Sequence, residues 1–352
     1  MRNIINKKRS FYNYYNPTYN TYRFKSFIYR GNSMTFSIEN IKEARERIAP
    51  YIAKTPLLRL YSMDAFLGCE VYVKAECMQI TGAFKLRGAM NKTLSLTKDE
   101  LARGVVTASS GNHGKGVAYA ANKLGTKATV VIPRTAPTVK IEAIRALGAE
   151  VILCDAAERF DVAREVCEKT GGVMIPPFND EQVMAGQGTI GLELAEQCPE
   201  LDRVIVPVAG GGLISGVATA VKACMPKTQV WGAEPAERAR YTASLAAGKP
   251  VSVEMKYTIA DALAATIPGD KCFPVVAANT DGFAAVDDEF LLKGMKLLLT
   301  EGKVLAEPSS CIGIGAVLQG CIKVTPGEKV CFVLSGGSVS LEQLDVLKSV
   351  SL

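Results

Sequence analysis

Short apolar runs and longer amphipathic stretches alternate along residues 37–352. Residues 114–124 and 140–147 have helical spacing, and Ile41, Ala44 and Ile48 give one apolar face to a helix that follows Ser37. Because strands that alternate with helices form parallel sheets, we expect an α/β protein with ligands at the carboxyl ends of its strands. The predicted buried strands are residues 70–76, 104–109, 128–133, 150–154, 204–208, 230–234 and 330–335.

The N-terminal segment has a different composition. Seven Lys and Arg residues fall within residues 1–33, the first acidic residue is Glu39, and neither structural period is present. We predict that residues 1–36 form a disordered basic extension, with action as a transit peptide as the alternative. The whole net charge of +6 comes from this extension, because residues 34–352 are nearly neutral. Residues 34–352 therefore carry no basic footprint for nucleic acid, and no run of eighteen apolar residues indicates a membrane span.

Cysteine and histidine restrict the chemistry further. The ten cysteines contain no C-x-x-C pair, and no secretory segment begins the chain, so we expect reduced, mostly buried thiols in a cytoplasmic protein. A transit-peptide role for residues 1–33 would instead place the protein in a mitochondrion or another organelle. The single histidine, His113, excludes zinc sites of the H-E-x-x-H type and relays of several histidines.

Glycine and hydroxyl residues follow three of the predicted strands, in T-A-S-S-G-N-H-G (107–114), V-P-V-A-G-G-G-L-I-S-G (206–216) and V-L-S-G-G-S (333–338). At the end of a strand such residues can offer backbone N–H groups to an anion, although a single segment of this kind is often only a tight turn. The spacings match neither the dinucleotide nor the P-loop pattern. The three together favour a compact monophosphate.

A lysine stands out in the segment K-A-E-C-M-Q-I-T-G-A-F-K-L-R-G-A (74–89). Lys85 follows a turn of small residues and stands beside Phe84. Such a lysine is commonly a solvated surface charge, whereas burial would lower its pKa and produce a reactive amine. The residues alone leave both interpretations open.

In this order and at these separations, T-G-A-F-K-L-R-G-A, S-S-G-N-H-G, A-G-Q-G-T and S-G-G-S resemble the fold-type-II pyridoxal-phosphate enzymes of the serine/threonine dehydratase and serine racemase family, over residues 37 to about 345. The resemblance implies two three-layer α/β domains with parallel sheets and pyridoxal 5'-phosphate (PLP) between them. Residues 37–103 and 180–352 would form the large cofactor-binding domain, and residues 104–179 the small domain. It also implies a small hydroxy-amino-acid substrate and a homodimer.

The resemblance assigns roles to individual residues. Lys85 would carry the cofactor on its amino group, Phe84 would pack beside the ring, Asn112 would bond the 3′-oxygen, and Ser335 would face the pyridine nitrogen. The expected phosphate-binding residues are Ala209, Gly210, Gly211, Gly212 and Leu213. The expected binding residues for the substrate carboxylate are Ser109, Ser110, Gly111 and His113, through backbone N–H groups. Ala209 departs from the usual glycine and must have negative φ.

A serine hydroxyl cannot stabilise a protonated pyridinium as a carboxylate can, so we expect β-elimination. The predicted reaction converts L-serine or L-threonine to pyruvate or 2-oxobutanoate plus ammonia, with Lys85 moving the Cα proton. Ser110 would be needed for racemisation, because it lies where the racemases of the family have their second acid or base.

Three further observations bear on the alternatives. Phe178 gives the segment P-P-F-N-D-E the form seen in the dehydratases. Glu234 matches one ligand of the racemases' cation site, but Arg240 stands where the second acid would be, so we expect no metal. A serine racemase with side β-elimination is the first alternative, and a catalytically idle regulatory protein of the same fold is the second.

Overall fold

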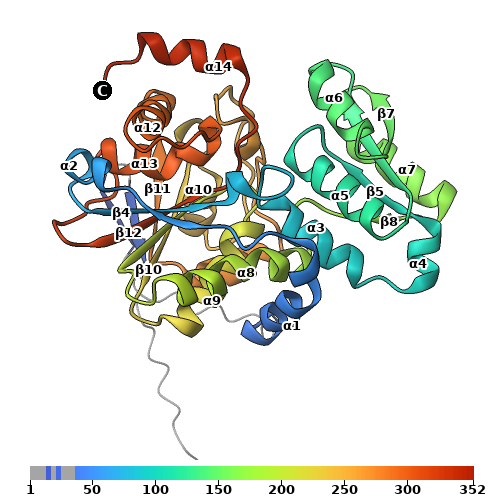
Figure 1. Ribbon diagram of the computed structural model, residues 1–352, viewed down its shortest axis with the longest axis horizontal. Coiled ribbons are helices and arrows are strands. Elements are labelled where there is room, and N and C mark those ends of the chain that lie inside the picture. Colours follow the sequence, from blue (N-terminus) through green and yellow to red (C-terminus); the bar gives the residue numbers. More distant parts are fainter. Residues whose placement is uncertain (1–12, 17–20, 25–35) are drawn as a thin grey trace, which may run out of the picture.

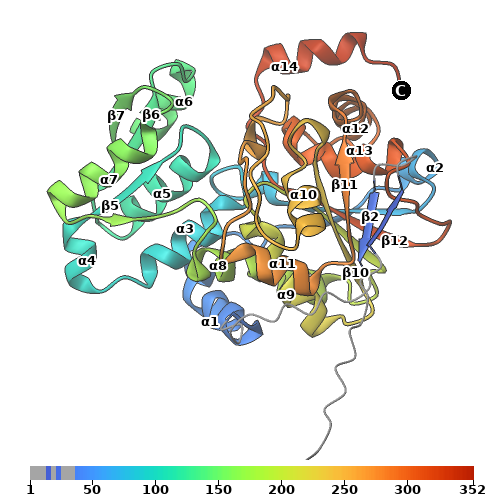
Figure 2. The same cartoon turned by 180° about the vertical axis from the view of Figure 1, so that it is seen from behind.

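The computed structural model describes residues 13–16, 21–24 and 36–352 of the chain (Figure 1). The described part has two α/β bodies side by side, one built on an eight-stranded sheet and one on a four-stranded sheet, and both remain distinct when the molecule is turned (Figure 2).

The large sheet has the strand order β1-β2-β11-β10-β9-β12-β4-β3. Its five central strands, from β11 to β4, are parallel, and the pairs β1/β2, β2/β11 and β3/β4 are antiparallel. The strands are β1 (Asn13–Asn16), β2 (Thr21–Phe24), β3 (Leu57–Arg59), β4 (Glu70–Ala75), β9 (Arg203–Pro207), β10 (Gln229–Pro235), β11 (Gly282–Val286) and β12 (Lys329–Leu334).

The small sheet is parallel throughout, with the order β7-β6-β5-β8. Its strands are β5 (Val105–Ala108), β6 (Ala128–Pro133), β7 (Glu150–Cys154) and β8 (Val173–Met174). They lie within residues 104–179, the range expected for the small domain.

All seven predicted strands are confirmed. Five further strands in the described residues were not predicted, namely β1, β2, β3, β8 and β11. Two of these, β1 and β2, lie in the extension for which the sequence predicts no regular structure, and β2 pairs with β11 at the edge of the large sheet. The rest of residues 1–35 lies outside the described residues.

The predicted helices are also present. The first of them, α1, begins directly after Ser37, and the contacts of Ser37 explain this start. The hydroxyl of Ser37 accepts a hydrogen bond from the backbone N–H of Glu39, and Ile41, Ala44 and Ile48 are fully buried. The helices of the N-terminal half are α1 (Ile38–Ile48), α2 (Asp64–Leu67), α3 (Lys85–Leu94), α4 (Lys98–Arg103), α5 (Asn112–Lys123), α6 (Thr138–Arg145) and α7 (Arg159–Thr170). Those of the C-terminal half are α8 (Glu181–Gln197), α9 (Gly212–Cys224), α10 (Arg240–Ala247), α11 (Cys272–Asn279), α12 (Asp288–Thr300), α13 (Ile312–Leu318) and α14 (Leu341–Val346).

Each sheet is covered by helices on both faces, which gives the expected three layers. Along β9, Val204 and Val206 belong to the core shared with α8 and α9, whereas Ile205 belongs to the core shared with α12 and α13. In the small body, Val105 packs toward α5 and α6, and Val106 packs toward α7.

A buried ionic cluster fixes helix α3 against the large body. Arg87 donates from Nε to Glu76 at 2.8 Å and from Nη1 to Glu193 at 2.6 Å, and Lys74 Nζ donates to Glu193 at 2.6 Å. Because these charges come from α3, α8 and the segment around β4, they fix the position of α3 relative to α8 and β4. Lys85, two residues before Arg87, is held in place by the same helix.

All ten cysteines lie in the described part and are unpaired, and six are buried, as the sequence predicts. In the described part of the chain, none of the helices combines the length and the apolar character needed to cross a membrane.

Candidate active site

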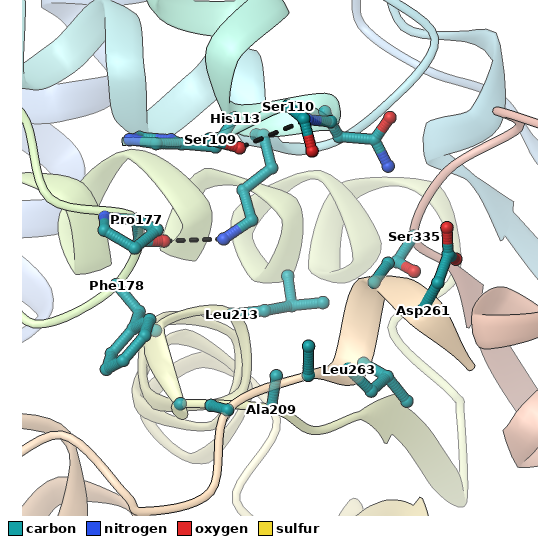
Figure 3. A pocket seen from close by; sticks show the side chains of 18 of the residues that line it. Ser109, Ser110, His113, Pro177, Phe178, Ala209, Leu213, Asp261, Leu263 and Ser335 are labelled. Atoms are coloured by element: carbon teal, nitrogen blue, oxygen red, sulfur yellow. Dashed lines mark hydrogen bonds between the residues drawn. The ribbon is translucent and has the colours of Figure 1, made fainter. Parts of the chain in front are cut away.

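The thirteen site residues predicted from sequence all line one cavity of about 500 Å³ between the two bodies (Figure 3). The cavity lies at the carboxyl ends of β5, β9 and β12, because its lining residues Ser109, Ala209 and Ser335 follow these strands directly or after one residue. This is where the sequence analysis expects a ligand to bind.

Lys85 begins helix α3 and lines the cavity. Its Nζ donates to the carbonyl oxygen of Pro177 at 2.6 Å and lies 5.2 Å from the centre of the Phe84 ring. Burial lowers the pKa of the Lys85 amine to about 8, which the nearby Cys272 and Glu307 oppose. The site thus holds a lysine whose amine loses its proton at a lower pH than an ordinary lysine does.

Close packing at the end of β9 requires the glycines found there. A Cβ on Gly210 would lie 2.4 Å from the Phe178 ring, and a Cβ on Gly211 would lie 1.8 Å from the Tyr241 hydroxyl oxygen. Gly211 also has φ +104°, a conformation that favours glycine. Lys303 is the only non-glycine residue with positive φ in the described ranges, so Ala209 has the negative φ that its side chain needs.

This turn leads directly into the 13-residue helix α9, which starts at Gly212. We call residues Val208–Gly212 the glycine loop. A helix start with free N–H groups favours an anion.

A second helix start, that of α5, forms the opposite wall. The segment from Ser109 to His113 lines the cavity, and the N–H of Gly111 donates to the Ser109 hydroxyl at 3.3 Å. The His113 ring is directed to the carbonyl oxygen of Ile175, 2.9 Å from Nε2. Burial, aided by Lys85, lowers the pKa of His113 to about 3, so the imidazole is neutral at physiological pH.

Glu307 is a further residue of this site that was not predicted from the sequence. Glu307 lines the cavity, and both of its carboxylate oxygens accept hydrogen bonds from Asn112 Nδ2 at 3.1 Å. Asn112 Oδ1 accepts a further bond from the Ser338 hydroxyl at 2.7 Å. Burial raises the pKa of the Glu307 carboxyl to about 7, against the lowering effect of Asn112. The one available signal was an acid followed by Pro and two serines in residues 306–310.

Ser335 is paired with another residue that the sequence analysis did not single out. Its hydroxyl lies 3.0 Å from the hydroxyl of Ser310, which also accepts a bond from the N–H of Gly336 at 2.8 Å. Ser335, which lines the cavity, therefore has a neutral hydroxyl group as its side-chain partner.

Glu234 and Arg240 are both fully buried behind the glycine loop. The Glu234 carboxylate accepts bonds from the N–H groups of Tyr241 at 2.9 Å and Thr242 at 2.7 Å. Burial raises the pKa of Glu234, and Arg240 opposes this shift. Within residues 36–352, no three His, Cys, Asp or Glu side chains gather as a metal site would require.

An ion pair joins the two bodies at the edge of the cavity. Lys140 of α6 lies 3.0 Å from the Asp261 carboxylate, and both residues line the cavity. The cavity wall is therefore shared between the small and the large body.

Comparison with known proteins agrees with this geometry. A family model described as "Pyridoxal-phosphate dependent enzyme" matches residues 48–336. A serine racemase of Oryza sativa subsp. indica is 44% identical over 310 residues, which is 86% of this chain and 91% of the relative. An L-threonine ammonia-lyase of Thermotoga maritima is 43% identical over 311 residues, covering 88% of this chain and 77% of the relative.

Solved structures give the same result for the fold. The structure of maize serine racemase superposes with a TM-score of 0.84 and 42% identity, and the match covers 88% of this chain and 96% of that one. From these matches we conclude that the chain belongs to the fold-type-II family of pyridoxal-phosphate-dependent enzymes.

Proposed function

We propose that the protein is a dehydratase that converts L-serine, L-threonine or both to pyruvate or 2-oxobutanoate plus ammonia. Enzymes described as racemases and as ammonia-lyases are similar to this chain to nearly the same degree, so identity alone does not choose between the two reactions. The proposal depends on the chemistry of the residues around the cavity.

The residues present fit PLP. Lys85 offers an amine to the cavity, and the glycine loop lines the same cavity with residues that close packing against Phe178 and Tyr241 requires to be glycine. Lys85 would hold the cofactor covalently, the glycine loop would hold its phosphate, Asn112 its 3′-oxygen, and Ser335 its ring nitrogen. When bound, PLP withdraws electrons from the substrate Cα and so makes its proton acidic.

Lys85 is the proposed base for the Cα proton. Because its pKa is about 8, a useful share of the amine is neutral near pH 7.5 and can accept a proton there. The backbone N–H groups at the start of α5 would hold the substrate carboxylate and orient Cα toward Lys85. The neutral His113 ring contributes no positive charge to this binding.

The observation that best supports β-elimination is the pair of hydroxyl groups of Ser335 and Ser310, whose oxygen atoms lie 3.0 Å apart. A hydroxyl at the ring nitrogen leaves that nitrogen unprotonated, whereas a carboxylate would stabilise its protonated form. A moderated electron withdrawal favours loss of the β-hydroxyl over exchange of the amino group.

Racemisation is the second candidate, and Ser110 is the residue that favours it. Ser110 lines the cavity and is a hydroxyl residue in the position that the racemases of the family use for the second face of the substrate. Elimination needs only space and a backbone N–H at that position, so alanine would suffice for it.

A substrate panel with chiral analysis tests the proposal. Wild-type holoenzyme should form ketoacid from L-serine or L-threonine faster than it forms the D-isomer. Ser110→Ala should keep ketoacid formation within about tenfold of wild type and lose D-isomer production. Lys85→Ala should keep less than about a hundredth of either activity, given the contribution of a positioned base. Faster D-serine formation than ketoacid formation in the wild type would identify a racemase instead.

A further inference from the structure

Two adjacent residues at the start of helix α10 reach the back of the glycine loop. Arg240 Nη1 donates to the carbonyl oxygen of Val208 at 2.8 Å. The Tyr241 hydroxyl donates to the carbonyl oxygen of Gly210 at 3.1 Å. These two carbonyl groups flank Ala209, so the loop is held from behind on both sides of one residue.

Both side chains are fixed by their surroundings. Tyr241 is fully buried, and its ring stacks on Phe283 with centroids 5.3 Å apart and on Phe273 with centroids 6.4 Å apart. The start of α10 is itself held by Glu234, because its carboxylate accepts hydrogen bonds from the backbone N–H groups of Tyr241 and Thr242. The two donors therefore cannot leave the loop without moving a helix end.

The Arg240 guanidinium is hydrogen-bonded only in part, although the Glu234 carboxyl lies close to it. Its side chain is fully buried, and among the described residues no hydrogen-bond partner exists for Nε or Nη2. An incompletely bonded guanidinium in the interior is costly, so it persists where it has an electrostatic partner or holds other groups in place. The group next to it is the loop that would bind a phosphate dianion.

We propose that Arg240 and Tyr241 are positioning residues for the cofactor phosphate. They bind the carbonyl groups of Val208 and Gly210 on the back of the glycine loop, and the loop N–H groups are thereby turned toward the cavity. Arg240 adds a buried positive charge behind those N–H groups, which strengthens the attraction for a dianion. This inference rests on the proposed role of the glycine loop, but it does not depend on which reaction the enzyme catalyses.

The test compares two cofactor forms that differ only in the phosphate. The full-length protein, stripped of cofactor, is titrated with PLP and with pyridoxal, and binding is followed by the visible absorbance of the adduct with Lys85. In Arg240→Met the dissociation constant for PLP should rise by about tenfold or more, as expected for loss of a charged hydrogen bond. The constant for pyridoxal should change by less than about threefold, because pyridoxal has no phosphate for the glycine loop to bind.

Three further variants separate positioning from damage to the fold. Tyr241→Phe keeps the stacked ring and should weaken PLP binding in the same selective way, and Arg240→Lys should recover part of the loss. The matched control is Arg238→Met, because Arg238 is also buried but donates to the carbonyl oxygen of Lys256 and not to the loop. It should bind both ligands as the wild type does.

Equal weakening of PLP and pyridoxal in Arg240→Met and Tyr241→Phe would assign these residues a merely structural role and overturn the proposal. Unchanged PLP binding in both variants would do the same. If PLP binding responds as expected while ketoacid formation is absent from the wild type, the proposed reaction fails and the positioning role stands.

Discussion

The single histidine allows a direct measurement of an unusual protonation state. His113 is 3% exposed, its Nε2 lies 2.9 Å from the carbonyl oxygen of Ile175, and its Nδ1 has no partner in the described part of the chain. A carbonyl accepts only, so Nε2 carries the hydrogen and Nδ1 is bare. A second proton on Nδ1 would then face no acceptor.

The magnitude follows from the pKa. Burial, aided by Lys85, lowers the pKa of His113 from 6.5 to about 3. A difference of this size makes protonation in the folded protein costlier by roughly 5 kcal/mol than in the unfolded chain. Since the folded pKa lies below the unfolded one, His113 contributes stability above about pH 6.5, and that stability is lost as the pH falls toward about 3.

The assay is an NMR titration of the histidine Cε1–H resonance in protein without a histidine tag. Between about pH 7.5 and about pH 5 the resonance of the folded protein should stay in place, whereas in denaturant it should shift with a midpoint near 6.5. As a second measurement, His113→Gln should remove a dependence of the unfolding free energy that approaches about 1.4 kcal/mol per pH unit below about pH 6. A midpoint between about pH 5 and about pH 7 in the folded protein would refute the reasoning.

Two other predictions concern the interior of the large body. Arg87→Met should lower the free energy of unfolding by about 3–5 kcal/mol, because it leaves the buried carboxylates of Glu76 and Glu193 without their main partner. Denaturant unfolding measures this free energy, and a loss below about 1 kcal/mol would contradict the prediction. Chelator treatment should leave activity and melting temperature unchanged, because the buried Arg240 supplies a positive charge close to Glu234. A substantial loss that Mg²⁺ or Ca²⁺ restores would show that a metal is needed.

Much of the fold was predictable because its buried strands are continuous apolar runs. Residues 128–133 and 150–154 were found with the boundaries of β6 and β7. Strand β11 (Gly282–Val286) was missed, since the run G-F-A-A-V contains small residues that do not favour a strand over a helix. The three-residue strand β3 is held only by its pairing with β4, which local sequence does not report.

The residues of the candidate site were predictable where they lie in short sequence motifs. They were not predictable where the site depends on contacts between residues far apart in the sequence. Lys85, Asn112 and Ser335 stand in segments with recognisable patterns. Glu307 stands in a segment without periodicity, and its contact with Asn112 joins residues 195 positions apart. Likewise, the donation from Tyr241 to Gly210 depends on how the start of α10 packs behind the glycine loop, and no spacing in the sequence encodes that distance.

The division of the cavity wall between two bodies has a consequence for access. The Lys140–Asp261 pair crosses from one body to the other, and its side chains are 31% and 49% exposed. An ion pair so exposed to water contributes at most about 1 kcal/mol, which corresponds to roughly a fivefold bias in an equilibrium. The pair therefore connects the two walls of the cavity only weakly, and a rise in ionic strength weakens the connection further. Access to the cavity at this edge thus meets only a small electrostatic barrier.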